Sequence, residues 1–410
     1  MPFHQSLLRK VITILRKPAS MRLNKKIALA FICSLALIGP VYSDEDENSS
    51  KVLREISELK DRIEELELVM EEVDERQGDR PLVQAFDGLK VDLGGFIHST
   101  YTYVEGENSS VGSFNRQNFE LLLGAELTKN WSAFFAGGFL RESDDPFVVG
   151  TPEDPEFDSN SANPLVIGWV NYQHNDFFNI RLGRISTPHG IINIEHFPAS
   201  LLDPEQPQFL RPFSGNTIFP NFSTGAQLHG RYFGSRATLG YTAYFTNANG
   251  ESLESNSEEI FGGRVSLASA GGAVELGLNY SDSFRAETNS DNTLYGVDLN
   301  LDLGRFSMKA ELFETSEDVG QDRSTFYIQP AWNLSDDWIV FYRYDELEKD
   351  EKSGQTILNV VGVNYLPHDN VRLRVTYSQK QFNDRLGNDV DDVLPDTESD
   401  TLQLSGTFSF

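Results

Sequence analysis

The sequence has a single cysteine, and it lies near the beginning of the chain. Cys33 stands in an apolar stretch before residue 44, so the rest of the chain can form neither a disulfide nor a cysteine-ligated metal site. After residue 43 the chain also lacks any apolar run of about 20 residues, the length that a membrane-spanning helix requires. If this part of the chain crosses a membrane, it must do so as a closed β-barrel.

Basic residues are scarce as well. The chain has 34 Lys and Arg against 62 Asp and Glu, for a net charge of −28. Such an acidic chain repels nucleic acid and anionic lipid headgroups, so we expect neither as a partner. The exception is residues 1–43, which carry seven basic residues and no acidic one. They predict a signal peptide that starts at Met21, with an apolar run at residues 27–39 and cleavage after Ser43.

Residues 44–80 are predicted to be an acidic linker followed by a coiled coil. Apolar residues recur there at alternating spacings of four and three, with charged residues between them, which is the heptad pattern of a helix that pairs with others. A single amphipathic helix on the protein's own surface is the alternative. The heptad residues are Val52, Ile56, Leu59, Ile63, Leu66, Met70 and Val73.

The hydrophobic period changes to two in the remainder of the chain, residues 81–410. Sixteen strand-like segments can be placed between Leu89 and Phe410, among them 338–346 and 355–366. The last segment shows the pattern well, because Leu402, Leu404 and Phe408 alternate with polar residues. An apolar face alternating with a polar face is compatible with a soluble sandwich and with a membrane barrel.

The connections between these segments favour the barrel. Short connections such as 128–130 and 234–235 alternate with long, acidic ones such as 143–162 and 383–399. Outer-membrane barrels have tight turns at the periplasmic end and longer loops outside. The predicted fold is therefore all-β, a 16-stranded antiparallel transmembrane β-barrel preceded by a short N-terminal α-helical coiled coil.

One connection, residues 186–222, is far longer than the others and shows no alternation. It holds six prolines and many aromatic residues, so it is stiff. Connections of this length in a compact fold are usually functional.

The start of this connection resembles a known family. The residues Ile180-Arg181-Leu182-Gly183-Arg184-Ile185-Ser186-Thr187-Pro188-His189-Gly190 are similar to the strand-to-loop segment of the phosphate-selective porin O/P superfamily, where a Gly-Arg/Gln-x-x-x-Pro-x-Gly pattern introduces a constricting third loop. The segment 114–121 resembles the second strand of the same families. The order of signal, coiled coil and sixteen strands resembles DcaP-like trimeric porins. The resemblance implies an outer-membrane porin, a homotrimer with one pore per subunit, and a constriction formed by residues 186–222.

Charged residues of this connection, together with Arg184 just before it, are predicted to line the constriction, and charged residues on the polar strand faces are predicted to line the pore wall. The constriction candidates are Arg184, His189, Glu195, His196, Asp203, Glu205 and Arg211. The wall candidates are Arg116, Glu120, Arg181, Arg231, Asp298, Glu311, Arg343, Arg372 and Arg374. The arginine and lysine ladder of phosphate-selective channels is missing. A mixed wall favours passage of small polar solutes and ions, and the acidic outer connections favour cations.

No enzymatic or cofactor chemistry is expected. The spacing of His189, Glu195 and His196 suits no helical metal-ligand pair, and no serine, histidine and carboxylate fall together as a nucleophilic site. Two alternatives to a general diffusion channel stay open: a substrate-specific channel for phosphate- or dicarboxylate-type anions, and a structural barrel that anchors the envelope through the coiled coil. Expected partners are lipopolysaccharide at the acidic outer connections and the barrel-assembly machinery at the strand that ends in Phe410.

Overall fold

The computed structural model describes residues 90–106, 110–142, 165–210, 217–247, 259–285, 290–317, 322–350, 354–383 and 398–410. The chain divides into two units, residues 1–85 and 86–410, and all described residues belong to the second. The predicted signal peptide and coiled coil therefore lie outside the described residues.

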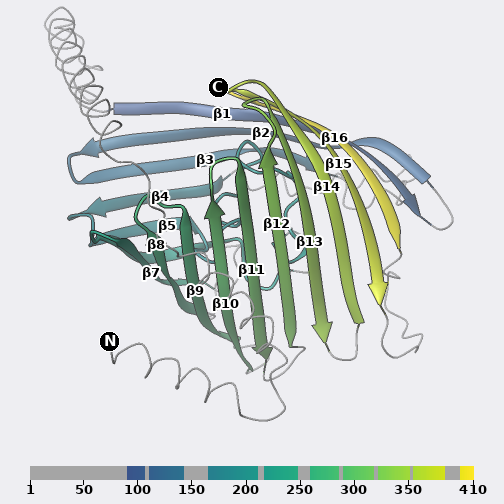
Figure 1. Ribbon diagram of the computed structural model, residues 1–410. Helices are drawn as coiled ribbons and strands as arrows, with labels where there is room; N and C mark the ends of the chain where they lie inside the picture. The colour runs from purple at the N-terminus through teal and green to yellow at the C-terminus, as the bar shows by residue number, and fades with distance from the viewer. Residues whose placement is uncertain are drawn as a thin grey trace, which may run out of the picture. The chain divides into compact units, whose positions relative to one another are not determined.

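Sixteen strands form a closed barrel in which each strand pairs antiparallel with its neighbours in sequence and β1 pairs with β16 (Figure 1). The prediction of a closed 16-stranded antiparallel barrel is confirmed. The strands are β1 (Lys90–Gly106), β2 (Ser110–Thr128), β3 (Trp131–Glu142), β4 (Leu165–Gln173), β5 (Asn179–Ser186), β6 (Phe222–Phe233), β7 (Ala237–Asn247), β8 (Glu259–Ser269), β9 (Val274–Arg285), β10 (Ser290–Asp302), β11 (Phe306–Glu317), β12 (Arg323–Asn333), β13 (Trp338–Asp350), β14 (Gly354–His368), β15 (Val371–Asn383) and β16 (Ser399–Ser409).

Alternation along each strand sorts the side chains between the two faces of the barrel. On β16, Leu402, Leu404 and Phe408 are exposed on the outer face, whereas Gln403 and Thr407 are buried on the inner face. The outer face can be apolar because it meets lipid, and the inner face can be polar because it lines the lumen. Alternation of this kind lets a chain of low mean hydropathy build a membrane protein. No helix in the described part of the chain is both long and apolar enough to span a membrane.

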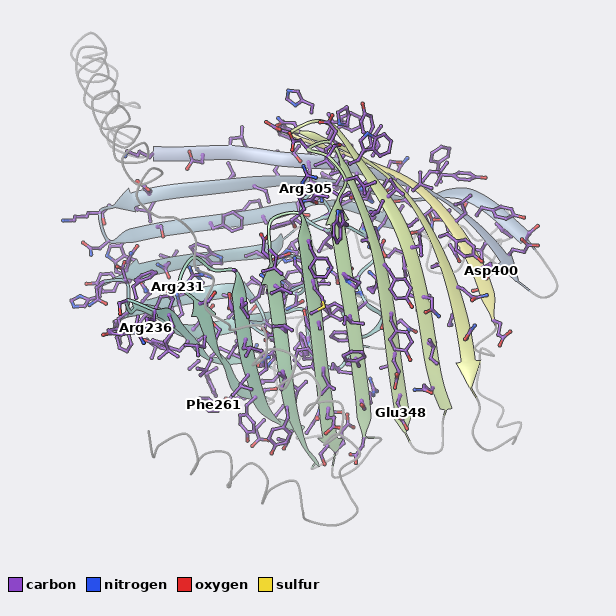
Figure 2. The ribbon with its side chains drawn as sticks, in the orientation of Figure 1. Arg231, Arg236, Phe261, Arg305, Glu348 and Asp400 are labelled. Atoms are coloured by element: carbon purple, nitrogen blue, oxygen red, sulfur yellow. The ribbon has the colours of Figure 1, made fainter. Side chains whose placement is uncertain are left out.

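The two ends of the barrel differ in their connections. At one end the strands are joined by turns of two to five residues, such as 129–130, 234–236 and 369–370. Figure 2 shows Arg231, Arg236 and Arg305 at this end, and Glu348 and Asp400 at the opposite end, where the longer connections run. The carboxyl terminus closes the barrel, since Phe410 and Gly95 exchange two backbone hydrogen bonds of 3.0 Å.

Several strands run past the limits that alternation predicts. Strand β13 ends at residue 350 rather than 346, and β14 begins at residue 354 rather than 355. Pairing continues there through polar residues, with Glu348 opposite Gln355 and Asp350 opposite Gly354. Apolar residues alternate only where a strand faces lipid. Backbone hydrogen bonds between strands can continue beyond the lipid, so the strands are longer than their alternating part.

Candidate functional site

The segment between β5 and β6 lies inside the barrel rather than outside it. In its described parts the one regular element is a 3-10 turn, η2 (Gln208–Leu210). Phe209 and Leu210 have no exposed surface, and they form one apolar cluster with Phe313 and Tyr327 of the inner wall. The phenyl rings of Phe209 and Phe313 lie 5.6 Å apart. This segment, residues 187–221, is called the inner loop below, and its described parts are 187–210 and 217–221.

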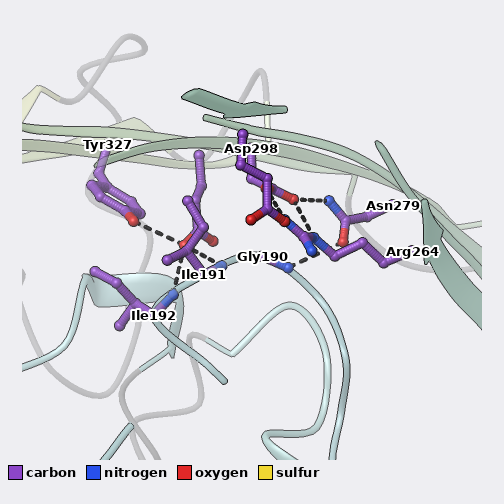
Figure 3. A network of polar contacts seen from close by, with 9 residues as sticks. Gly190, Ile191, Ile192, Arg264, Asn279, Asp298 and Tyr327 are labelled. Carbon is purple, nitrogen blue, oxygen red and sulfur yellow. Dashed lines mark hydrogen bonds and ion pairs between the residues drawn. The ribbon is translucent and has the colours of Figure 1, made fainter. Parts of the chain in front are cut away.

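A carboxylate on the wall binds the first turn of the inner loop (Figure 3). Glu311 Oε1 accepts hydrogen bonds of 2.8 Å from the backbone N–H groups of Ile191 and Ile192, and a third of 2.8 Å from the Tyr327 hydroxyl. Gly190 has a φ of +66°, and a Cβ there would lie 2.0 Å from Glu311 Oε2. Glycine is therefore required at 190, both for the left-handed backbone and for the close approach of the carboxylate.

Neighbouring polar groups extend this anchor along the wall. Asp298 lies directly opposite Glu311 in the β10–β11 register. The Arg264 guanidinium donates to both Asp298 carboxylate oxygens, at 2.9 and 2.5 Å, and Asn279 Nδ2 donates to one of them at 2.8 Å. Asn279 Oδ1 in turn accepts from the Gly190 N–H at 3.1 Å. One hydrogen-bonded network thus joins the inner loop to strands β8 to β12.

The root of the inner loop is closed by two asparagines and a histidine. Asn193 Nδ2 donates to the carbonyls of Thr187 and Asn221, at 2.7 and 3.2 Å, and so bridges the two ends of the loop. The Tyr244 hydroxyl lies 2.7 Å from His189 Nε2. Burial lowers the pKa of His189 to about 4, although the charge of Asp298 acts against the shift. The imidazole is therefore neutral at pH 7, and its Nε2 shares one hydrogen bond with the Tyr244 hydroxyl.

Three wall arginines hold the second half of the inner loop by its carbonyl groups. Arg343 forms a 2.9 Å ion pair with Asp203 and donates to the Glu205 carbonyl at 2.9 Å. Arg372 donates to the Leu201 carbonyl at 3.0 Å, and Arg374 donates to the same carbonyl at 2.9 Å. Arg374 also binds the Pro198 carbonyl and the Thr407 hydroxyl. These arginines, predicted as wall charges, lie against the loop.

Glu195 and Glu205 of the inner loop also contact the wall. Glu195 pairs with Lys309 of β11, and the Glu205 carboxylate accepts from the Gln403 amide of β16. His196 binds the Asn193 carbonyl through Nδ1 at 3.1 Å, and burial lowers its pKa to about 4. Arg211 lies outside the described residues.

The remaining wall candidates lie on β2, β5 and β6, away from the anchors. Glu120 is buried, and Arg231 is exposed near the turn end of β6. Arg116 lies opposite Thr100 in the β1–β2 register. Arg181 stacks on Trp169, with its guanidinium carbon 4.0 Å from the ring centroid. Arg184 donates from Nε to the Val166 carbonyl at 3.0 Å. Its neighbour Ile185 packs inside the barrel on Tyr244, so Arg184 falls on the other face of the strand by alternation.

Several wall residues that hold the loop were not identified from the sequence, among them Arg264, Lys309, Tyr327 and Gln403. All four share the face of a named wall residue, since Lys309 lies two positions before Glu311 and Tyr327 lies opposite it in the register. Alternation therefore indicated their face. Their role depends on the path of the inner loop, which the sequence does not give. Within the described ranges, no group of three or more His, Cys, Asp or Glu side chains is arranged to hold a metal ion.

Acid should loosen the root of the inner loop. The pKa of His189 falls from an ordinary 6.5 to about 4 in the folded protein, so the folded state binds fewer protons than the unfolded state between these values. Its contribution to stability is complete above pH 6.5 and is lost as the pH falls through 4, and a shift of this size corresponds to roughly 3 kcal/mol. We expect open-channel current noise to rise between pH 6 and pH 4. His189→Gln, which stays neutral, should remove this component, and an unchanged pH profile in that variant would contradict the assignment.

The comparisons with known proteins agree with this architecture. Residues 81–385 match the family described as Gram-negative porin. Among solved structures, an anion-selective porin from Comamonas acidovorans is 14% identical over 78% of this chain and 100% of its own, with a TM-score of 0.55. Salmonella typhi OmpF in complex with daunomycin is 13% identical over 79% and 98%, with a TM-score of 0.53. The trimer form of Vibrio cholerae OmpT is 9% identical over 78% and 99%, with a TM-score of 0.50. No curated protein matches the sequence.

Proposed function

The chain belongs to the Gram-negative porin family and is a non-enzymatic diffusion channel of the bacterial outer membrane, and we propose that its inner loop is the constriction that sets which small polar solutes and ions pass. The observation that carries this proposal is the double anchoring of the loop. Glu311 of β11 binds its first turn, and Arg343 of β13 together with Arg372 and Arg374 of β15 binds its second half. A segment held against the inner wall at two places narrows the path through the lumen.

Single-channel recording of the refolded full chain in a planar bilayer tests this function. We expect stable conductance steps, because a fixed loop leaves a fixed opening. Under a salt gradient, the sign of the reversal potential gives the ion preference. A heat-modifiable, correctly folded barrel that conducts no ions would contradict the proposal and favour the envelope-anchoring alternative. That alternative depends on residues 52–73, which lie outside the described residues.

We propose more narrowly that the chain is a trimeric porin of the O/P type. Support comes from the Gly-Arg-x-x-x-Pro-x-Gly residues, because Gly183 within β5 and Gly190 in the first turn of the inner loop both have positive φ, at +129° and +66°. The trimer form of OmpT, which shares the fold, agrees with a homotrimer. Steps grouped in threes in the same recording are the expected result.

Two further partners are part of this proposal. The terminal strand β16, with Leu404 and Phe408 exposed on one face and Phe410 at its end, has the form expected of a substrate of the barrel-assembly machinery. The acidic outer connections are proposed to bind lipopolysaccharide through divalent cations. Residues 1–43 and 44–80 keep their predicted roles as signal peptide and as linker with coiled coil.

A channel that prefers anions is the second candidate. Among the described residues, two of the inner-loop carboxylates are matched by basic wall residues, Glu195 by Lys309 and Asp203 by Arg343. Their charges are therefore offset, which weakens the argument for cations drawn from the acidic composition. The reversal potential decides between the two preferences.

A further inference from the structure

We propose that Arg181, stacked on Trp169, is the specificity-determining residue of the channel and binds planar organic anions such as aromatic carboxylates as they pass. The inference rests on the proposed channel function and names the solute class that the channel favours. It depends on three features of strands β4, β5 and β6: an arginine without a partner, an aromatic support, and two flanking amides.

The first feature is the missing partner of Arg181. Among the arginines whose side chains the structure describes, Arg181 is the one that is not exposed and yet has no hydrogen bond or ion pair, and its Nε is buried without a partner. Arg343 and Arg374, by contrast, are occupied by the inner loop, and Arg264 by Asp298. Burial keeps Nε itself from meeting an anion, so the donors that an anion in the lumen can reach are the terminal NH₂ groups of Arg181, which are not among the buried atoms.

The second feature is the aromatic support. The Arg181 guanidinium carbon lies 4.0 Å from the Trp169 ring centroid, and Trp169 stacks in turn on Phe134 at 5.5 Å and 27°. Stacking fixes the guanidinium plane and leaves the N–H groups at its edge free to donate. A planar fork of donors matches a carboxylate in two parallel hydrogen bonds. The half-buried indole offers an aromatic solute an apolar surface next to that fork.

The third feature is a row of polar side chains across three strands. Asn171 of β4 and Gln227 of β6 lie directly opposite Arg181 in the register, one on each side. Both are largely buried, with 7% of their surface exposed. Asn171 Oδ1 is engaged by His229 at 2.9 Å, so its NH₂ group is oriented and available as a donor. The row therefore presents hydrogen-bond donors around one positive charge, which suits an anion and disfavours a cation.

An aromatic carboxylate combines the features that this site recognises. Its carboxylate group accepts from the arginine fork and an amide, while its ring contacts the indole. Acetate has the carboxylate without the ring, and chloride has neither the shape nor the ring. We therefore expect benzoate to bind within the channel more strongly than acetate or chloride.

The test measures conductance in planar bilayers as the concentration of benzoate is raised at fixed ionic strength, with acetate as the matched probe. In the wild-type protein the benzoate conductance should saturate, whereas the acetate conductance should rise in proportion to concentration. Arg181→Gln should raise the half-saturating benzoate concentration by about tenfold, the loss expected for one charge-assisted hydrogen-bond pair. Arg181→Lys, which keeps the charge but loses the fork and the stacking, should show most of this loss.

Arg236→Gln is the matched control, because Arg236 is exposed in the turn between β6 and β7, and its removal changes the net charge equally (Figure 2). It should leave the half-saturating concentration unchanged. Trp169→Leu should remove the difference between benzoate and acetate. The proposal is overturned if Arg181→Gln and Arg181→Lys conduct chloride as stable channels and still saturate at the wild-type benzoate concentration. Absence of any conductance in the folded wild-type protein would instead overturn the channel function itself.

Discussion

Replacing Glu311 by alanine should release the first turn of the inner loop and raise the single-channel conductance. The carboxylate is the common acceptor of the Ile191 and Ile192 amides and of the Tyr327 hydroxyl. Each buried donor left without an acceptor costs about 1–3 kcal/mol, so the folded state with the loop in place should lose on the order of 4 kcal/mol. Urea-induced unfolding in lipid vesicles gives the stability, and planar-bilayer recording gives the conductance.

Glu311→Gln is the matched control for this change. All three hydrogen bonds end on Oε1, and Oε2 is buried without a partner, so an amide of the same shape keeps the acceptor that matters. We expect glutamine to retain more than half of the stability that alanine loses, with conductance close to that of the wild-type protein. An alanine variant with wild-type stability and conductance would show that this anchor does not hold the loop.

Breaking the ion pair between Asp203 and Arg343 should be the second large effect. Both side chains are almost completely buried, and the atoms lie 2.9 Å apart. Removing one partner leaves the other charge buried and unpaired, which costs about 3–5 kcal/mol. Asp203→Asn and Arg343→Met should each destabilise the barrel by this amount, and each should make the conductance less uniform because the loop is held less firmly.

The double variant measures the interaction between Asp203 and Arg343 apart from the contacts that each makes with other residues. The second substitution removes a charge that the first has already left unpaired. The double variant should therefore lose about 2 kcal/mol less stability than the sum of the two single variants. The exposed pair of Lys90 and Glu126, 3.8 Å apart, serves as the control, and its cycle should show a coupling indistinguishable from zero. Strictly additive losses for Asp203 and Arg343 would mean that they do not interact in the folded protein.

The architecture of the barrel could be predicted because it depends on local sequence. A period of two fixes which face each residue occupies, and turn residues between strands fix antiparallel order. Both signals are present within any stretch of about ten residues. Two observations then indicated a closed ring. The strand count is even, and the outward leucines and phenylalanines have no soluble core in which to be buried.

The contacts of the inner loop could not be predicted in the same way. Alternation indicates the face of Glu311 and Arg374, but their partners in the loop are 119 and 173 residues away along the chain. The loop has no period, so neither its path nor the residues that meet it can be read from its sequence. Three of the arginines expected to face the lumen as wall charges, Arg343, Arg372 and Arg374, bind loop carbonyls, because a loop inside a barrel has backbone groups that the wall must satisfy.

The stacked pair of Arg181 and Trp169 illustrates a second limit. The two residues lie on adjacent strands, and their register is offset by two positions, with Trp169 opposite Gly183 and Asn171 opposite Arg181. The side chains meet diagonally, a contact that depends on the twist of the sheet rather than on the pairing alone. Sequence reasoning identified Arg181 as a wall residue but had no signal for the indole beneath it.

The measurement that tests the central claim most directly compares single-channel conductance in the full-length protein with and without the inner loop. In the second protein, residues 190–220 are replaced by a short glycine and serine linker between the ends of β5 and β6. Both proteins should form stable channels, and the shortened one should conduct more and should lose the discrimination between small and large solutes. Equal conductance and equal size limits in the two proteins would contradict the claim that the inner loop forms the constriction.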